Sequence, residues 1–196
     1  MYKRQTPSSK RGKFFSDKFD SDIICLTEGY ETLLPQDGYI ISSNEDYGYK
    51  IQKGRRKVIL WSKNKWTEVN QIGSKEIPTG RFISGVTNGI KIVGLCIPWR
   101  FAHVSTGRKD RKPWEDHLSF IKNLSFSNEK TIILGDFNQN IPKKNQPEIV
   151  FSSLKKMIDG FNLLTTNMGL IHIVISTDLK AESIQKIATE NNSDHD

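Results

Sequence analysis

Cysteine, long apolar runs and flexible linkers are all scarce in this chain of 196 residues. No window approaches the roughly 18 apolar residues of a membrane-spanning helix, and the chain does not open on the charged-then-apolar pattern of a secretory signal. No internal repeat and no Pro/Gly/Ser-rich stretch divides the sequence. These absences exclude a membrane-spanning or multidomain chain, and they predict a single domain of a cytoplasmic protein.

Only two cysteines occur, Cys25 and Cys96, and each lies in an apolar, strand-like run. Buried, reduced thiols suit such runs, so we expect no disulfide framework. There is no CxxC pair and no Cys/His cluster with the spacing of a zinc site. Any bound metal is therefore expected to be a hard cation held by oxygen ligands.

Acidic residues are outnumbered, with 22 Asp and Glu against 29 Lys and Arg, which gives a net charge of +7. The excess favours a phosphate-bearing partner such as nucleic acid. A basic but merely solvated surface explains the charge equally well. Positive residues concentrate in segments 3–18, 50–65 and 100–112. The last segment has the strongest claim to a function because it leaves the strand that ends at Pro98, beside the motif described below.

Hydrophobic patterning predicts many strands and few helices, which is typical of an α/β sheet sandwich rather than of a strictly alternating fold. The expected strands are Asp22–Thr27, Tyr39–Ser43, Lys57–Ser62, Arg81–Thr87, Gly89–Pro98, Thr131–Leu134 and Gly169–Ser176. The expected helices are 8–20, Trp114–Leu124, Phe151–Phe161 and a short one at Leu179–Ile187. A long basic loop is expected over Arg100–Pro113.

The most informative stretch is TIILGDFN, residues Thr131–Asn138. Its aliphatic residues predict a buried strand, after which Gly135 lets the backbone turn. Asp136 and Asn138 are two residues apart, so in an extended segment their side chains share a face and can address one point. The ends of buried strands often carry the chemistry of α/β enzymes. Taken alone, the stretch is equally consistent with a polar turn that closes a strand.

Two further acidic motifs accompany this one, DIICLTE ending in Glu28 and SDHD with Asp194 and His195. With these three motifs in this order, the chain resembles the endonuclease/exonuclease/phosphatase superfamily of metal-dependent phosphodiesterases, over about residues 8–195. The segment IPWR…GRKDRKPWEDH fits the family layout, in which a strand ending in proline leads through a basic loop into the helix before GDFN. The resemblance implies a DNase I-like fold, a four-layer α/β sandwich of two packed mixed β-sheets flanked by helices.

The resemblance also implies a role for each matching residue. Glu28 would bind a divalent cation, Mg²⁺ or Mn²⁺, and Asp194 would help bind the metal or hold His195. Asp136 would orient or deprotonate the attacking water, while Asn138 would hold the phosphate and position Asp136. His195 would hydrogen-bond the scissile phosphate and stabilise its developing charge.

The chemistry of phosphodiester hydrolysis calls for such a set independently of any family. The phosphodiester is anionic, so its hydrolysis needs a cation on a non-bridging oxygen, a base for water and donors for transition-state charge. Arginine binds phosphate bidentately, so the basic loop supplies candidates for substrate contact, although a merely solvated loop explains each of them too. These candidates are Arg100, His103, Arg108, Lys109 and Arg111.

Departures from the family pattern bear on activity. The chain has no Trp-Asn pair of the kind that ends the family's first strand. Cys96 stands where relatives usually carry a His or Tyr that contacts phosphate, and Ile171 stands where they often have an aspartate that orients the histidine. Residues 1–5 resemble a translated sequencing adapter, or else form a genuine disordered N-terminus, and residues 6–196 are then one incomplete domain.

We therefore predict that the parent protein is a monomeric, metal-dependent phosphodiesterase, with nucleic acid favoured as substrate and a nuclease as the expected activity. This shorter polypeptide is expected to be weak or inactive. Two alternatives stay open: a catalytically impaired nucleic-acid-binding module of the same fold, or a phosphatase that acts on a small phosphorylated substrate.

Overall fold

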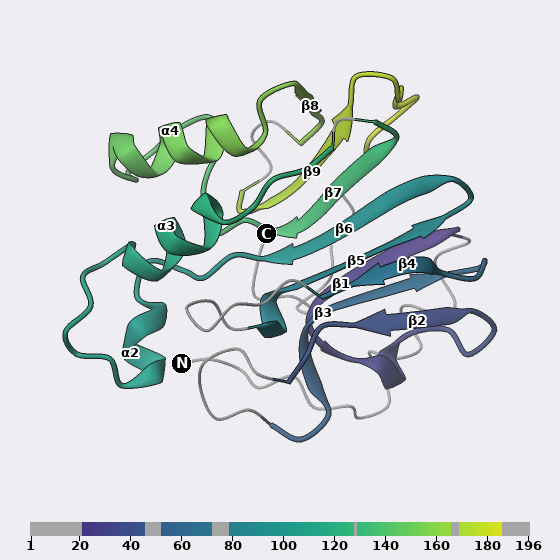
Figure 1. Ribbon diagram of the computed structural model, residues 1–196, viewed down its shortest axis with the longest axis horizontal. Coiled ribbons are helices and arrows are strands. Elements are labelled where there is room, and N and C mark those ends of the chain that lie inside the picture. Colours follow the sequence, from purple (N-terminus) through teal and green to yellow (C-terminus); the bar gives the residue numbers. More distant parts are fainter. Residues whose placement is uncertain (1–20, 46–51, 72–78, 128, 166–168, 186–196) are drawn as a thin grey trace.

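The computed structural model describes residues 21–45, 52–71, 79–127, 129–165 and 169–185, which form two β-sheets packed face to face (Figure 1). The smaller sheet has the strand order β1-β3-β2 and the larger one β4-β5-β6-β7-β9-β8. The smaller sheet consists of β1 (Ile23–Tyr30), β2 (Tyr39–Ser42) and β3 (Arg55–Ser62). The larger consists of β4 (Thr67–Asn70), β5 (Phe82–Thr87), β6 (Ile90–Cys96), β7 (Thr131–Asp136), β8 (Phe161–Leu163) and β9 (Ile171–Ser176).

The strand directions bring the carboxyl ends of β6 and β7 together. These two strands are parallel, with Cys96 opposite Asp136, whereas all other described strand pairs are antiparallel. The crossover between them carries helices α2 (Ala102–Thr106) and α3 (Glu115–Lys122). Figure 1 shows both helices on the side toward which the arrowheads of β6 and β7 point. Polar residues at the ends of these two strands therefore meet at one edge of the sandwich.

Helices cover the outer face of the larger sheet. Helix α3 and helix α4 (Glu148–Met157) pack on it through a buried apolar cluster. Alternate residues of the strands point to this face, because the side-chain period of a strand is two. The cluster includes Val93, Leu95 and Ile133 from the sheet and Phe120 and Leu154 from the helices.

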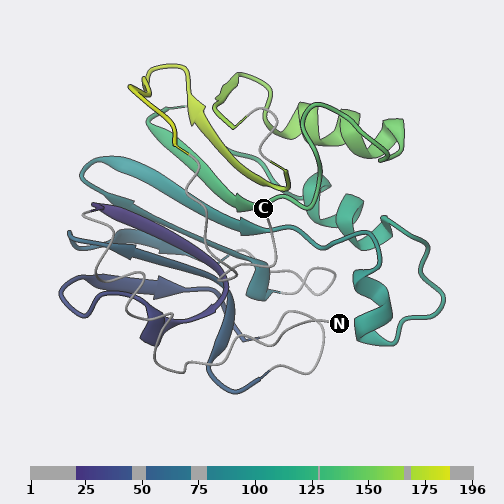
Figure 2. The ribbon, with the colours of Figure 1, turned by 180° about the vertical axis from the view of Figure 1, so that it is seen from behind.

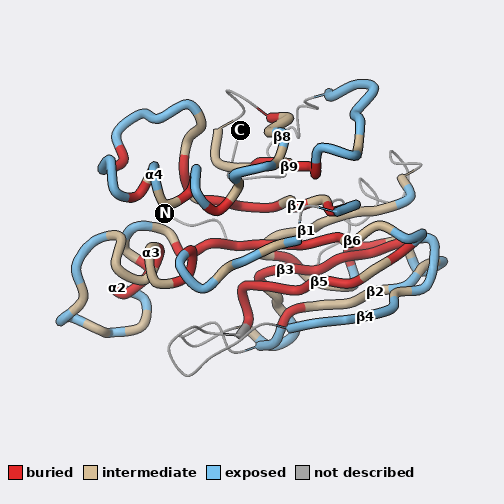
Figure 3. Tube along the Cα trace, turned by 45° about the horizontal axis from the view of Figure 1, so that its top comes forward, coloured by how far each residue is buried: buried red, intermediate tan, exposed pale blue. Residues whose placement is uncertain are grey.

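The two sheets meet through a second apolar cluster. Strands β1 and β3 contact β6, and Figure 1 and Figure 2 show β1 alongside it from both sides. Val58 and Leu60 of β3 pack there against Ile92 and Cys96 of β6. A Cβ at Gly94 would lie 2.5 Å from Val58 Cγ1, so glycine is needed for this close approach. Figure 3 shows β3, β5 and β6 as the continuously buried centre of the molecule.

The outer face of the smaller sheet is covered by the segment after β1. The 3₁₀ turn η1 (Glu31–Leu33) is followed by Leu34, which is buried against Ile59 and Trp61 of β3. Among the described residues this face carries no α-helix. The smaller sheet is wholly antiparallel in the described residues, and the larger one is mixed.

The predicted fold class is confirmed: the chain is an α/β sandwich of two packed sheets with flanking helices. Both cysteines are free thiols, as expected. The predicted helix over Leu179–Ile187 is wrong for its described part, since residues 179–185 are irregular. The basic loop contains the short helix α2. The helix expected over residues 8–20 lies outside the described residues. Within the described part of the chain, no helix is long and apolar enough to cross a membrane.

Candidate functional site

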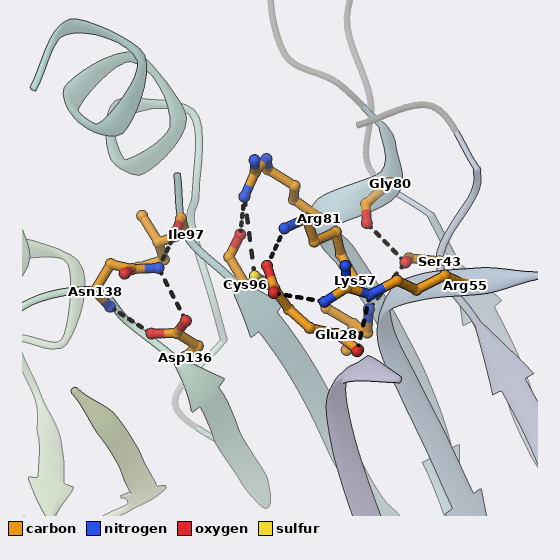
Figure 4. Close-up of polar contacts among 11 residues, drawn as sticks. Glu28, Ser43, Arg55, Lys57, Gly80, Arg81, Cys96, Ile97, Asp136 and Asn138 are labelled. Carbon is orange, nitrogen blue, oxygen red and sulfur yellow. Dashed lines mark hydrogen bonds and ion pairs between the residues drawn. The ribbon is translucent and has the colours of Figure 1, made fainter. Parts of the chain in front are cut away.

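The Asp136–Asn138 turn has the mutual geometry expected from its spacing (Figure 4). The Asn138 backbone N–H donates to Asp136 Oδ1 at 2.9 Å, and Asn138 Nδ2 donates to Asp136 Oδ2 at 3.0 Å. The same Nδ2 also donates to the Ile97 carbonyl at 2.7 Å. An amide nitrogen has two hydrogens, so both are used within the turn. Asn138 thus holds the Asp136 carboxylate, and contact with a phosphate through Nδ2 would require one of these bonds to be exchanged.

The backbone of the turn explains its residue types. Gly135 has φ 136°, and a Cβ there would lie 2.1 Å from the Leu95 carbonyl oxygen, so no other residue fits without a shift. Asn138 has φ 52°, in the left-handed region that asparagine tolerates better than most residues. Phe137 between them is fully buried in the cluster under the helices. The turn is therefore anchored by its apolar residue and presents the buried Asp136 at the strand end.

Glu28 lies on β1 directly across from Lys57 on β3, between the Thr27–Val58 and Gly29–Arg56 pairs of the antiparallel ladder. The Lys57 ammonium donates to Glu28 Oε1. Arg55 donates through a guanidinium nitrogen to Glu28 Oε2 at 2.9 Å and through Nε to the Glu28 carbonyl at 3.0 Å. Both carboxylate oxygens of Glu28 are thus held by cationic side chains of the neighbouring strand (Figure 4).

The ionisation of Glu28 follows from these neighbours. Burial by itself would raise its pKa, but the charges of Lys57, Arg55 and Arg81, together with the Lys57 hydrogen bond, bring the pKa below its ordinary value. Glu28 is therefore anionic at neutral pH. The Lys57 side chain is only 6% exposed and that of Glu28 29%, so the ion pair is largely shielded from water.

Arg81 and Cys96 lie between the two carboxylates. Arg81 ends the 3₁₀ turn η2 (Thr79–Arg81), is buried, and donates to the Cys96 carbonyl at 3.2 Å. Burial raises the pKa of the Cys96 thiol to about 12; the charges of Asp136 and Glu28 act in the same direction, and those of Lys57 and Arg81 oppose it. The thiol is therefore neutral, and it stands beside Asp136 in the register of β6 and β7.

The donor set around Glu28 does not fit a divalent cation. Mg²⁺ demands oxygen ligands in nearly ideal octahedral geometry, whereas both Glu28 oxygens already pair with Lys57 and Arg55. Over the ranges that the structure describes, no group of three or more His, Cys, Asp or Glu side chains is placed to hold a metal ion. The role of Glu28 as a Mg²⁺ or Mn²⁺ ligand stays a prediction from the family pattern, and the described geometry does not favour it. Asp194 and His195 lie outside the described residues.

Two candidate substrate contacts in the basic loop are engaged within the protein. Arg108 donates to Asp116 Oδ2 at 2.8 Å, and Arg111 donates to Glu115 Oε1 at 2.6 Å. Both acidic partners lie in the first turn of α3, where negative charge is favoured by the helix dipole. These pairs fix the course of the loop, so phosphate binding by either arginine would compete with an internal carboxylate.

The other three candidates differ in exposure. His103 is buried on α2, whereas Arg100 and Lys109 are exposed. The Arg100 guanidinium lies 4.6 Å from the centre of the Phe101 ring. Arg100 and Lys109 are thus the two candidates exposed to solvent, and the substrate-binding role of all five residues remains a prediction.

A buried network of polar side chains holds the Asp136–Asn138 turn in place. Gln139, directly after Asn138, donates from Nε2 to His117 Nε2 at 2.7 Å, and its carbonyl accepts from His172 Nε2 at 2.8 Å. His117 in turn donates from Nδ1 to the Pro98 carbonyl at 2.6 Å. These donor roles follow from requiring each bond to have one hydrogen. The network ties the turn to α3, to the segment that follows β6 and to β9, so its position is set by three parts of the chain.

Sequence reasoning missed the cationic half of the site. Arg55, Lys57 and Arg81 were visible only as members of a basic stretch and as the start of a strand. An available signal was the antiparallel pairing of β1 with β3, because opposite residues on paired strands interact directly. Without knowledge of the strand register, the sequence does not show which lysine lies opposite Glu28.

The two-sheet sandwich with an Asp–Asn turn at the strand ends is the arrangement of a DNase I-like fold. A model of the endonuclease/exonuclease/phosphatase family matches residues 13–145, and the chain belongs to this family. No curated protein sequence matches the chain.

Three solved structures share the fold at low sequence identity. An AP endonuclease from Archaeoglobus fulgidus superposes with a TM-score of 0.56 at 16% identity, covering 77% of this chain and 65% of that one. A 3′-5′ exonuclease from Neisseria meningitidis gives 0.55 at 14%, covering 84% and 80%. A beta toxin from Staphylococcus aureus with bound magnesium ions gives 0.51 at 15%, covering 88% and 78%. The chain thus spans less than two thirds of the archaeal endonuclease, and at these identities the likeness shows the fold alone.

Proposed function

We propose that the chain recognises and hydrolyses phosphodiester bonds of nucleic acid. The observation that carries this proposal is the Asp136 carboxylate, held in place by Asn138 and set at the strand ends opposite Cys96, whose thiol is also reached by the charges of Lys57 and Arg81. The net charge of +7 suits a polyanion. The fold is shared with an AP endonuclease and a 3′-5′ exonuclease.

The residues divide the chemistry between them. Asp136 orients a water molecule and accepts its proton as the water oxygen bonds to phosphorus, while the bond from phosphorus to the ester oxygen opposite breaks and that oxygen takes a proton from solvent to leave as an alcohol. Asn138 fixes the carboxylate so that this geometry is present before substrate arrives. Lys57 and Arg81 supply positive charge for the non-bridging oxygens, which gain charge in the transition state. His195 is proposed to add a further donor, in keeping with the family pattern.

A second function is favoured by one specific observation. Glu28, which the family pattern marks as the metal ligand, is paired on both oxygens with Arg55 and Lys57. A chain with this arrangement could retain the phosphate-binding surface and lack turnover. The second candidate is therefore a nucleic-acid-binding module of the same fold.

Cleavage and binding must be measured on the same samples to separate these functions. We expect slow nicking of supercoiled DNA or slow turnover of a bis-aryl phosphodiester by the wild type, in keeping with the weak activity expected of this polypeptide, and a further loss of about 10²-fold or more in Asp136→Asn. Asp159→Asn is the matched control, because Asp159 is exposed just beyond α4. Binding without cleavage, with or without Mg²⁺, would establish the second function. Absence of both binding and cleavage, for DNA and RNA alike, would overturn both.

A further inference from the structure

The pairing of Glu28 with Lys57 is built into the β-sheet rather than made by loose surface side chains. The two residues lie at the step of the β1–β3 ladder between the Thr27–Val58 and Gly29–Arg56 pairs, and the Lys57 side chain is only 6% exposed. Lysine is almost never buried without a partner, because an isolated ammonium is costly to remove from water. Lys57 therefore stays next to the carboxylate through the packing of its own strand.

The backbone of Glu28 directs its side chain into this arrangement. Strict alternation along β1 would place Glu28 on the face of Ile24 and Leu26, which pack away from the larger sheet. Glu28 instead has φ 56°, a conformation that a non-glycine residue adopts at a cost. The charge of its carboxylate raises the pKa of the Cys96 thiol, and Cys96 belongs to the facing sheet. The strained conformation thus turns Glu28 toward the site, where Lys57 and Arg55 meet it.

The charge balance of the described site is already positive. Two carboxylates, Glu28 and Asp136, stand with three cationic groups, Arg55, Lys57 and Arg81. Two carboxylates alone would repel a phosphodiester, and a divalent cation is one means of reversing that field. In this chain the side chains of β3 and η2 supply the positive charge themselves.

We propose that the Lys57 ammonium, backed by Arg55, takes the place of a divalent cation at Glu28, so that phosphodiester binding by this chain is independent of divalent metal. The inference rests on the proposed recognition of phosphodiesters and specifies how the charge for it is supplied. A divalent ion that took the same carboxylate oxygen would separate the largely buried Lys57 ammonium from the Glu28 carboxylate and bring a second positive charge beside it, which is unfavourable.

The first experiment needs only the wild-type chain. Fluorescence anisotropy with labelled single-stranded and hairpin DNA is measured in EDTA and in Mg²⁺ at matched ionic strength, because salt itself weakens such binding. We expect equal affinities in the two conditions. We also expect no rise in Tm with millimolar Mg²⁺ or Mn²⁺, and no immobilised Mn²⁺ by electron paramagnetic resonance.

The second experiment opens the site to metal. Lys57→Met keeps an unbranched side chain one atom shorter than lysine, removes the ammonium and frees Glu28 Oε1. We therefore expect this variant to gain a Tm rise with Mn²⁺ that Glu28→Gln, added to it, abolishes. Lys63→Met is the matched control, since Lys63 is 44% exposed and pairs with Asp22 at the other end of the same ladder. A Lys57→Met variant that responds to Mn²⁺ no more than Lys63→Met would count against the proposal.

The two proposals fail in different ways. If wild-type binding to DNA weakens by more than about tenfold in EDTA, and Glu28→Gln weakens it equally in Mg²⁺, the chain uses a metal at Glu28 and the inference is overturned. The proposed recognition of phosphodiesters would stand in that case. If the wild type binds no nucleic acid in either condition, the proposed function fails, while the Mn²⁺ measurements still decide whether Lys57 excludes the metal. Those measurements are made on the folded wild type, so they hold even if Lys57→Met does not fold.

Discussion

Glu28 and Lys57 occupy opposite positions on adjoining antiparallel strands, and the ammonium of one donates to the carboxylate of the other. Glu28 is the residue that the family pattern marks for a metal. Its partner, Lys57, lies 29 residues further along the chain, on the neighbouring strand. The electrostatics of the site are thus set by strand pairing.

This ion pair is expected to stabilise the fold measurably. Lys57→Met should lower the free energy of unfolding by about 1–3 kcal/mol, between the values for exposed and fully buried pairs. Arg55 keeps both of its hydrogen bonds to Glu28, one to the carboxylate and one to the backbone carbonyl, which limits the loss of stability. A double-mutant cycle of Lys57→Met with Glu28→Gln, followed by urea unfolding, isolates the coupling.

The exposed pair of Arg56 with Glu45 provides the comparison, since Glu45 has a side chain 57% exposed. Its Glu45→Gln variant should change stability by less than about 1 kcal/mol. Equal effects at the two pairs would show that burial does not strengthen the Glu28–Lys57 contact.

Asn138 is expected to matter through its side chain as well as its backbone. Asn138→Ala removes the bonds to Asp136 and Ile97 and places alanine at φ 52°. We expect the free energy of unfolding to fall by about 2–4 kcal/mol, of which roughly 1 kcal/mol comes from the backbone conformation. Asn88→Ala is the matched control, because Asn88 has the same φ of 52° in an exposed turn.

Calorimetry on both variants separates the two contributions. Asn88→Ala should lose only the backbone part and keep the activity of the wild type. Equal destabilisation by the two substitutions would mean that the side-chain bonds of Asn138 contribute little.

Acid is expected to destabilise the protein through His117. Burial lowers the pKa of this histidine from 6.5 to about 4, against a smaller opposing effect of its bond to Pro98. Below pH 6.5 the unfolded chain binds a proton that the folded chain refuses, so stability falls as the pH falls from 6.5 to about 4. Protonation of this histidine lowers the free energy of unfolding by about 3 kcal/mol, and most of this effect is reached at about pH 4.

Unfolding free energies over this pH range test the expectation. His117→Gln should be less stable at neutral pH and should depend less steeply on pH, because it has no proton to take up. The pKa of His172 is also lowered, mainly by burial, so a residual slope of the same sign is expected. A wild-type stability that rises on acidification would contradict the assignment of a neutral, buried His117.

Lys109 is expected to contact phosphate in a manner independent of sequence. It is exposed on the basic loop, whereas Arg108 and Arg111 are paired with acids of α3. Lys109→Ala should reduce the slope of log affinity against log salt by about 1 and weaken binding to all sequences alike. Lys155→Ala on the exposed side of α4 is the control. If the salt dependence of binding is unchanged in Lys109→Ala, Lys109 does not contact phosphate.

Local patterns in the sequence were sufficient for much of the fold. The nearly continuous apolar run in GIKIVGLCIP predicts a buried strand, and β6 contributes residues to the apolar clusters on both of its faces. The GDFN motif predicts a turn that brings Asp136 and Asn138 together, and the two side chains do bond. In both cases the determining physics is local: side-chain period, backbone conformation and a separation of two residues. The predicted helix at Leu179 failed because a short amphipathic pattern does not hold a helix without a surface to pack on.

The sequence by itself determined the family, the sheet sandwich and the Asp136–Asn138 turn, because these follow from short-range patterns. Tertiary structure alone decided the charge around Glu28. The left-handed backbone at Glu28, the register that sets Lys57 opposite it and the burial of Arg81 beside Cys96 each depend on strands far apart in the chain. Charges that meet only through strand pairing leave no periodic trace in a sequence, and for that reason the acidic half of this site was predictable and the cationic half was not.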